Sequence, residues 1–372
     1  MNKVIIIGDD NVNTLGVIWN FSKKNIKVYL LIMGINHKLS VIKSRYVEKY
    51  WVCENTSSLI KQLHAIFEDE NDKPVLIPTT DSSALIIDNN YDSLKEKYIL
   101  PSINNVKGNI EMYMNKYNQF KLACNNNVKM AKTKVLDLRK KESITFPCIL
   151  KPIVSAKGKK EDIRICNNSI EFEEAKKELL ELNYTKILYQ QFLTYCYEID
   201  VSGFSYNGDV SIPGYIKKER IWPSGRGSTT FGIVKNIHGL DNIIDGIKNI
   251  MKQINYNGIF DIDIFVVKKD KENIFYLNEI NFRNGAIAYS YGESLISYYW
   301  YLSNINNKMF FSPSIKKDYY VINEQADLHN LFERKISLFR YLGDLRKSKI
   351  KMNFNIRDIK PCIYACLYKF FR

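Results

Sequence analysis

The sequence predicts an α/β protein whose first part holds a parallel sheet and whose later part is α+β, with antiparallel strands. Near the start, short apolar runs alternate with helix-like stretches, the order that produces a parallel sheet covered by helices. Further on, residues 260–265 and 275–283 alternate polar and apolar side chains around a polar tip, as a half-buried hairpin does. The composition agrees, because 45% hydrophobic and 25% charged residues among 372 are ordinary for a globular protein.

Apolar runs at residues 4–7, 28–32 and 74–78 are the predicted strands of the parallel sheet. Residues 15–23 and 57–67 are the predicted helices between them. The Gly-x-Gly-x-x-Gly fingerprint does not follow the first strand, and this disfavours a nicotinamide-binding role.

Three polar residues, Thr79, Thr80 and Asp81, come directly after the third predicted strand. Proteins with α/β sheets place binding groups at the carboxyl ends of their strands. The same residue types also cap helices. Both interpretations stay open at this stage.

Two lysines in the middle of the chain lie on predicted ordered elements. Lys116 follows Asn115 at the start of a helix, and Lys151 lies on an apolar strand at residues 146–152. The small, basic loop at residues 155–160, which contains Lys157, suits closure over phosphates, and it also fits a flexible surface turn.

Glycines and serines in residues 217–230 predict a mobile loop. The arginines in this segment, Arg220 and Arg226, indicate an anionic ligand such as a substrate carboxylate or a phosphate.

The hairpin at residues 260–283 concentrates polar groups on one face. Side chains two apart on a strand share a face, so Asp261 and Asp263 lie opposite the apolar core residues of their strand. On the second strand, the corresponding polar face carries Glu279, Asn281 and Arg283. Hard oxygen ligands suit Mg²⁺ held between protein and phosphates, and a guanidinium suits a phosphoryl oxygen. The alternative is a solvated, acidic strand face.

The cysteines and the amino terminus predict a cytoplasmic protein. Seven scattered cysteines show no zinc-ligand spacing, which indicates reduced thiols. The first apolar run is too short for a signal peptide, and no apolar run approaches the roughly 20 residues of a membrane-spanning helix.

The net charge of +14 is concentrated near the carboxyl terminus. Residues 331–372 hold eleven Lys or Arg against three acidic residues, a local excess of +8. These cations flank apolar residues, among them Leu338, Phe339 and Leu342. We expect a tail that packs on the body or touches an anionic membrane surface, with a solvated basic helix as the alternative. Nucleic acid is not an expected partner, because aromatics are not interleaved along a basic face.

The order of these parts resembles the ATP-grasp superfamily of carboxylate–amine ligases, and most closely its D-aspartate-ligase-like branch. Each motif is weak alone, but their order and spacing make a strong signal across nearly the whole chain. The motifs are Lys43-Ser44-Arg45-Tyr46, Ile77-Pro78-Thr79-Thr80-Asp81, Asn115-Lys116, Phe146-Pro147-Cys148-Ile149-Leu150-Lys151-Pro152, Tyr189-Gln190-Gln191-Phe192-Leu193 and Asn278-Glu279-Ile280-Asn281-Phe282-Arg283.

The resemblance implies a Rossmann-like pre-ATP-grasp domain at residues 1–105. A two-lobed ATP-grasp domain would follow, with a small lobe at 106–185 that holds the lysine strand and a large lobe at 186–310 that holds the metal hairpin. Residues 311–372 would form the basic tail.

The resemblance also implies roles for single residues. Lys116 and Lys151 would reach ATP phosphates, with Lys157 in the phosphate loop. The adenine hinge would be the backbone of Gln191, Phe192 and Leu193, with Gln190 nearby, and Glu198 would bind the ribose. The implied metal ligands are Asp263, Glu279 and Asn281, and the implied catalytic residues are Lys151, Arg283, Arg220 and Arg226.

The sequence departs from the family pattern at two places. Aspartate stands at position 263 where glutamate is usual, so Asp261 could share the metal. The loop after Lys151 is poorer in glycine than in many members of the family.

The implied activity joins a small-molecule carboxylate to an amine, an amino acid being the expected type. ATP would convert the carboxylate into an acyl phosphate with the help of Mg²⁺, expected as two ions and replaceable by Mn²⁺. Loops at residues 155–160 and 224–230 are the expected lids over the acyl phosphate. The alternative is an ATP-binding sensor or scaffold without turnover. A homodimer is among the expected assemblies.

Overall fold

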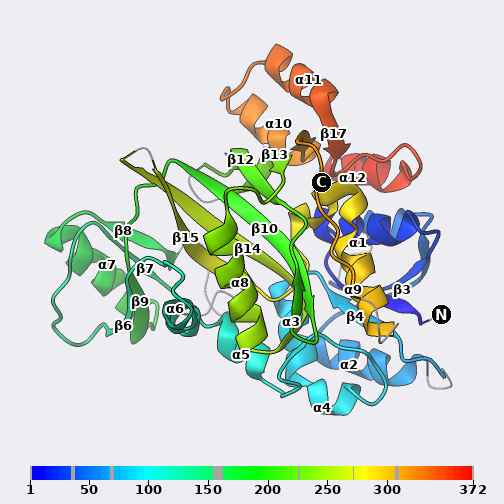
Figure 1. The fold of residues 1–372 in the computed structure, drawn as a ribbon, viewed down its shortest axis with the longest axis horizontal. Helices are drawn as coiled ribbons and strands as arrows, with labels where there is room; N and C mark the ends of the chain where they lie inside the picture. Colours follow the sequence, from blue (N-terminus) through cyan, green and yellow to red (C-terminus); the bar gives the residue numbers. More distant parts are fainter. Residues whose placement is uncertain are drawn as a thin grey trace.

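The computed structural model describes residues 2–34, 38–67, 71–153, 162–224, 227–270, 272–305 and 310–370. Three sheets organise these residues, one parallel at the amino terminus and two mainly antiparallel, and this confirms the predicted fold class. In Figure 1 the smallest lobe projects at the left, and the large sheet separates it from the amino-terminal domain.

The amino-terminal sheet is parallel, with the strand order β3-β2-β1-β4. Its strands are β1 (Val4–Gly8), β2 (Val28–Met33), β3 (Val47–Cys53) and β4 (Val75–Pro78). The helices of this domain are α1 (Val12–Ser22), α2 (Thr56–Ala65), α3 (Asp81–Asn89) and α4 (Tyr91–Leu94). The sequence did not predict β3, because this edge strand is largely exposed and lacks a buried apolar run.

The small lobe is a four-stranded antiparallel sheet in the order β6-β9-β7-β8. Its elements are β6 (Thr133–Asp137), β7 (Cys148–Lys151), β8 (Arg164–Cys166), α7 (Ser169–Glu181) and β9 (Lys186–Gln191). The core residues Phe172, Ala175 and Leu179 of α7 pack on the sheet. Because β9 pairs with β6 and β7, the expected boundary between 185 and 186 falls just before a strand of this sheet.

The large sheet has nine strands, with the path β15-β14-β10-β12-β13-β16-β17 and with β11 and β5 attached at its side. Its strands are β5 (Ser102–Ile103), β10 (Tyr197–Tyr206), β11 (Asp209–Ser211), β12 (Tyr215–Trp222), β13 (Ser228–Lys235), β14 (Tyr256–Lys269), β15 (Glu272–Asn281), β16 (Tyr319–Ile322) and β17 (Ser348–Lys351). The predicted acidic hairpin is β14 and β15, paired along their length.

Two apolar cores cover the faces of the large sheet. On one side, α5 (Asn109–Met114), α6 (Lys116–Asn125) and α8 (Asp241–Gln253) pack against core residues of β14 such as Ile262. On the other side, α1, the 3₁₀ segment η4 (Ala286–Ser294) and α9 (Ile296–Ile305) form the second core. The second core also contains residues of β1 and β2, so the amino-terminal domain and the large sheet share it.

The prediction of a mobile loop at residues 217–230 is wrong for most of that segment. The structure places two paired strands there, β12 and β13, with irregular register around Arg220. Thr229 and Thr230 are buried in β13, so residues 228–230 of the expected lid at 224–230 belong to a strand. The irregular register shifts side chains of β12 from one face of the sheet to the other. The sequence therefore does not show the regular polar and apolar alternation that predicts a strand.

The carboxyl-terminal residues extend the large sheet rather than hanging free. Strand β16 pairs with β13, and β17 pairs with β16. The helices here are α10 (Glu324–Phe332), α11 (Leu338–Lys347) and α12 (Lys360–Phe370). Near α12, Asp358 accepts hydrogen bonds from Trp19 Nε1 at 2.9 Å and Ser44 Oγ at 2.5 Å, which ties the tail to the amino-terminal domain. Among the described helices, none has the length and apolar character to cross a membrane.

Candidate active site

Two buried lysines from different elements meet beside the acidic hairpin. Lys116 is the first residue of α6, which Asn115 caps, and Lys151 ends β7. The Nζ atom of Lys151 donates to Gln190 Oε1 at 2.8 Å. Burial, together with the positive charge of Lys116, lowers the pKa of Lys151 to about 7, although Glu279 opposes this shift.

The hairpin register places the predicted metal ligands opposite one another. Asp263 pairs with Glu279, and Asp261 pairs with Asn281. The Nζ atom of Lys116 lies 3.6 Å from Glu279 Oε1. The structure therefore brings lysine ammonium groups and the oxygens of this hairpin into one place.

A further lysine, Lys218 of β12, lies among three carboxylates. Its Nζ atom is 2.5 Å from Asp263, 3.1 Å from Glu198 and 3.8 Å from Asp200. Burial alone would lower the pKa of Lys218, but Asp263, Asp200 and Glu198 outweigh burial and raise the pKa well above its ordinary value. Lys218 is therefore an ammonium ion that neutralises part of this acidic cluster.

Two of the acidic residues, Asp200 of β10 and Asp261 of β14, are buried on neighbouring strands. Asp261 accepts a hydrogen bond of 2.5 Å from Ser202 Oγ. Burial raises the pKa of Asp200 well above its usual value, and repulsion from Asp261 and Asp263 adds to the effect. The Oδ1 atom of Asp200 is buried without a hydrogen-bond partner among the described atoms. Such a concentration of oxygens favours a bound cation.

Arg283 joins the hairpin to the amino-terminal domain. Its Nε atom donates to Asp81 Oδ1 at 3.0 Å, and its Nη1 atom lies 3.4 Å from Asp261 Oδ2. Residues 79–81 were interpreted above either as binding groups at a strand end or as a helix cap, and the structure supports both interpretations. Thr80 caps α3 in a capping box, and Asp81 faces the cluster through Arg283.

The expected adenine hinge follows β9. The backbone N–H of Gln191 donates to Lys132 O at 2.8 Å, and that of Phe192 donates to Pro147 O at 3.2 Å. Leu193 continues the segment next to these two residues. The expected hinge therefore begins at the end of β9 in the small lobe, and the chain continues from it into β10 of the large sheet.

Glu198 lies on β10, close to the hinge. Its carboxylate accepts hydrogen bonds from Tyr195 Oη at 2.6 Å and from Lys218 Nζ at 3.1 Å. Tyr195 stacks on Phe265 with ring centroids 4.4 Å apart. Glu198 therefore borders the acidic cluster through Lys218.

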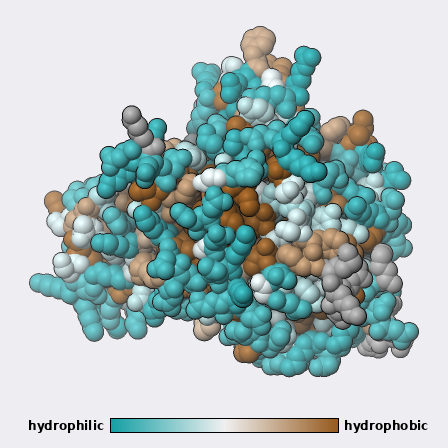
Figure 2. All heavy atoms as spheres, viewed as in Figure 1, coloured by the Kyte–Doolittle hydropathy of each residue, from teal (hydrophilic) through white to brown (hydrophobic). Residues whose placement is uncertain are grey.

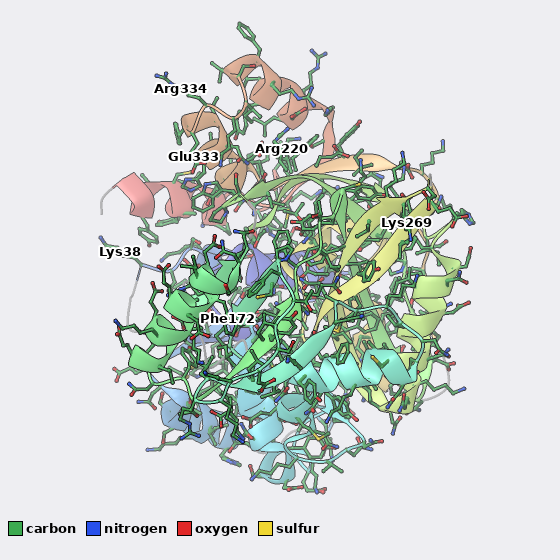
Figure 3. All side chains as sticks on the ribbon, turned by 90° about the vertical axis from the view of Figure 1, so that its left-hand side faces the viewer. Lys38, Phe172, Arg220, Lys269, Glu333 and Arg334 are labelled. Atoms are coloured by element: carbon green, nitrogen blue, oxygen red, sulfur yellow. The ribbon has the colours of Figure 1, made fainter. Side chains whose placement is uncertain are left out.

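The structure places Arg220 in a different setting from the one expected. Its guanidinium donates to both carboxylate oxygens of Asp327, at 3.0 and 2.6 Å, and to Asp344 Oδ2 at 2.6 Å. Figure 3 shows Arg220 with Glu333 and Arg334 in the part formed by the carboxyl-terminal helices. Buried carboxylates of α10 and α11 already bind this guanidinium. This geometry disfavours a contact between Arg220 and a substrate. Arg226 and Lys157 lie outside the described residues.

The residues of the cluster fit a metal shared with phosphates better than a metal cage made by protein alone. Among the described ranges, no group of three or more His, Cys, Asp or Glu side chains is arranged to hold a metal ion. The predicted set is two carboxylates and an amide, and lysines pair with both carboxylates, Lys218 with Asp263 and Lys116 with Glu279. Mg²⁺ commonly takes one or two carboxylates and completes its shell with phosphate oxygens and water.

One cavity of the described structure lies apart from these residues. It has a volume of about 430 Å³ and lies between the loop after β1 and the carboxyl-terminal helices. Its walls include Asn11, Ser40, Trp222, His329 and Cys362. Trp222 and His329 stack with ring centroids 3.8 Å apart. We place the candidate site at the charged cluster and not at this cavity, because the paired lysines and carboxylates lie in the cluster.

Sequence reasoning missed Lys218 and Asp200. Asp200 lies among the apolar residues of β10. Its cross-strand pairing with Asp263 would have identified it if β10 and β14 had been aligned. Lys218 carried no such signal, since it lies in the segment interpreted as a loop.

At the level of sequence, no protein-family model and no curated protein matches the chain. Solved structures do match its fold. An L-amino acid ligase from Bacillus licheniformis has a TM-score of 0.58 and 15% identity, over 80% of this chain and 70% of that one. An N5-carboxyaminoimidazole synthetase from Staphylococcus aureus, complexed with ADP, has a TM-score of 0.63 and 16% identity, over 90% of this chain and 88% of that one.

The biotin carboxylase domain of a Hydrogenobacter thermophilus 2-oxoglutarate carboxylase, in complex with MgADP, ADP and bicarbonate, is also similar. Its TM-score is 0.58 and its identity 17%, over 76% of this chain and 64% of that one. Identities this low establish the architecture and leave the substrate open. The chain therefore has the ATP-grasp fold, which it shares with ligases of different substrates.

Proposed function

We propose that this chain is an ATP-dependent ligase that activates a carboxylate as an acyl phosphate and joins it to an amine. The observation that carries the proposal is the convergence of Lys116 and Lys151 beside the hairpin residue Glu279, which pairs across the hairpin with Asp263. Each comes from a separate element, and the burial of both lysines has an energetic cost that a bound anion would offset.

The lysines would bind ATP phosphates. Lys151 is buried and its pKa is lowered to about 7, so an anionic phosphate would stabilise its charged form. Lys116 would contact the same anion from the start of α6. Asp263, Glu279 and Asn281 would hold Mg²⁺, which neutralises charge on the transferring phosphoryl group when bound.

The adenosine would lie between the two lobes. Gln191, Phe192 and Leu193 would contact the adenine through their backbone, and Gln190 would remain with Lys151. Glu198 would accept hydrogen bonds from the ribose once Lys218 or Tyr195 shifts. These placements are supported by the connection at residues 192–196, which joins β9 of the small lobe to β10 of the large sheet.

The reaction proceeds in two steps. A carboxylate oxygen attacks the γ-phosphorus of ATP, the bond to the bridging oxygen breaks, and ADP leaves. The amine then attacks the acyl carbon, inorganic phosphate leaves, and the amine loses a proton. Arg283 lies beside Asp261, where its guanidinium would stabilise the negative charge of the acyl phosphate.

An amino acid is the substrate class we propose, because a similar fold is used by an L-amino acid ligase. The second candidate function is an ATP-binding sensor or scaffold without turnover. It predicts tight binding of Mg-ATP with no substrate-dependent hydrolysis. The presence of both lysines together with the three proposed metal ligands favours the ligase.

The test is the release of ADP and phosphate from Mg-ATP with a panel of D- and L-amino acids, each paired with amine acceptors. Release that requires one particular acid supports the ligase and identifies its carboxylate. Release with no pair, despite Mg-ATP binding, favours the sensor. A chain that does not bind Mg-ATP contradicts both.

A further inference from the structure

Exposed apolar side chains gather in the carboxyl-terminal part of the described structure. Nine of the fifteen large apolar residues that are exposed lie between Phe332 and Leu367. Four of them, at the end of α10 and on α11, define what we call the α11 patch: Phe332, Leu338, Phe339 and Leu342. Figures 1 and 2 show that α11 projects from the body and that apolar atoms lie on the outside of this projection.

The α11 patch is the outer face of an amphipathic helix. Tyr341 and Asp344 are buried on the inner face of α11. Leu338 and Leu342 are four residues apart and therefore lie on one stripe, with Phe339 beside them. Phe339 is 88% exposed and Phe332 is 75% exposed. The described part of the chain does not cover this face.

Cations surround the α11 patch. Residues 332–351 contain seven Lys or Arg and only two acidic residues, Glu333 and Asp344. Asp344 is buried and bound by Arg220 and Lys347, and Glu333 pairs with Lys335. Arg334 and Arg346 are exposed, and Figure 3 shows Arg334 at the outer edge of this region. The outward surface is therefore apolar at its centre and positive around it.

We propose that the α11 patch docks onto the surface of an anionic lipid bilayer. An amphipathic helix with aromatic and aliphatic residues between cations lies in the interface of such membranes, with its apolar face below the headgroups. Each Lys or Arg near an anionic surface adds to the attraction. The proposal is independent of the proposed ligase activity.

Two other occupants fit the observations less well. In a symmetric dimer the same patch would face itself, and the surrounding cations of the two copies would repel each other. Nucleic acid is bound through phosphate contacts with Lys and Arg, which do not require exposed Phe339 or Leu342.

The experiment is co-sedimentation of the full chain with vesicles. One set contains equimolar phosphatidylcholine and phosphatidylglycerol, and the other contains phosphatidylcholine alone. We expect binding to the anionic vesicles only. A double variant, Phe339→Glu with Leu342→Glu, should lower the partition coefficient by about tenfold or more. The matched control is Ile170→Glu with Leu182→Glu, at two exposed apolar positions of the small lobe, and it should bind like the parent.

A second variant separates the charge from the apolar contact. Arg334→Glu with Arg346→Glu should weaken binding to anionic vesicles and reduce its dependence on salt. Equal binding of the parent chain and both patch variants would overturn the proposal. So would a parent dimer that the Phe339→Glu, Leu342→Glu variant converts to a monomer while vesicle binding is absent. Salt-sensitive binding to random DNA without vesicle binding would overturn it in favour of nucleic acid.

Discussion

The Nζ atom of Lys218 lies 2.5 Å from Asp263 Oδ1, at the centre of the acidic cluster. Glu198 and Asp200 contact the same ammonium group at 3.1 and 3.8 Å. One lysine thus neutralises carboxylates of β10 and of β14. The carboxylate on β14, Asp263, is a proposed metal ligand. A cation that entered the cluster would compete with this ammonium group for Asp263.

Replacing Lys218 by Met should destabilise the protein by about 3–5 kcal/mol, because buried carboxylates would lose their partner. Unfolding in urea measures the change. Mg²⁺ should stabilise this variant more than it stabilises the parent, since the ion would take the place of the lost charge. The control is Lys217→Met, where the neighbouring lysine is partly exposed and pairs with Glu219, and a loss of at most about 1 kcal/mol is expected. Equal losses in the two variants would contradict the central position of Lys218.

Replacing Glu279 by Gln should abolish Mg-dependent turnover and leave the fold intact, because the change removes charge but little volume. Turnover of Mg-ATP with the cognate acid is the measurement, and circular dichroism checks the fold. Glu272→Gln is the matched control, since Glu272 is exposed at the tip of the same hairpin, and it should keep full activity. Full activity in Glu279→Gln would show that the metal assignment is wrong.

Binding of Mg-ATP should take up protons through Lys151. Its pKa is lowered from 10.5 to about 7, so between these two values much of Lys151 is neutral before ATP binds. The phosphates would raise the pKa again and draw a proton from solution. Calorimetry in two buffers with different ionisation enthalpies measures the uptake. Lys151→Gln should remove it, whereas Lys134→Gln, at a half-buried position of β6 where the lysine pairs with Glu142, should not. Identical uptake in the parent and in Lys151→Gln would exclude Lys151 as its source.

The same shift in pKa predicts how stability depends on pH without ligand. The unfolded chain keeps a proton on Lys151 up to about 10.5, whereas the folded chain loses it near 7. The unfolded state therefore binds more protons in this window, and the contribution of Lys151 to stability rises as pH increases through it. Relative to Lys151→Gln, the parent should gain stability with increasing pH in that range.

Replacing Arg220 by Met should lower stability by about 3–5 kcal/mol, because Asp327 and Asp344 are buried carboxylates that would lose their main partner. Affinity for Mg-ATP should change little. Arg340→Met is the control, since Arg340 is mostly exposed and contacts only Asp344 in the described structure. If Arg220→Met were as stable as the parent and raised the KM for the acid substrate, the role first expected from the sequence would hold.

Local patterns predicted most of the site. Helix α6 begins at Lys116 as expected, because Asn115 supplies a cap that the sequence shows directly. The alternation of β14 and β15 predicted that Asp263 and Glu279 share a face, and their cross-strand pairing brings them together. Signals of this kind depend on residues close in the chain or on a fixed strand period.

Partners from distant segments could not be predicted. The pairing of Arg220 with Asp327 and Asp344 depends on how β12 meets α10 and α11 in space, and neither sequence spacing nor composition reports that. The arginine looked available for a ligand because its carboxylate partners lie more than a hundred residues away. Lys218 was missed for a similar reason, since irregular strand register obscured the face it shares with Asp263.

The unbroken hydrogen-bonded path from β14 to β17 sets the separation, along the large sheet, between the proposed metal strand and the strand next to α11. Five strand-to-strand steps separate the proposed metal strand from the strand next to α11, and at about 4.8 Å each they amount to roughly 24 Å along the sheet. If the α11 patch docks as proposed, that length of sheet separates the lipid-bound helix from the proposed reaction centre.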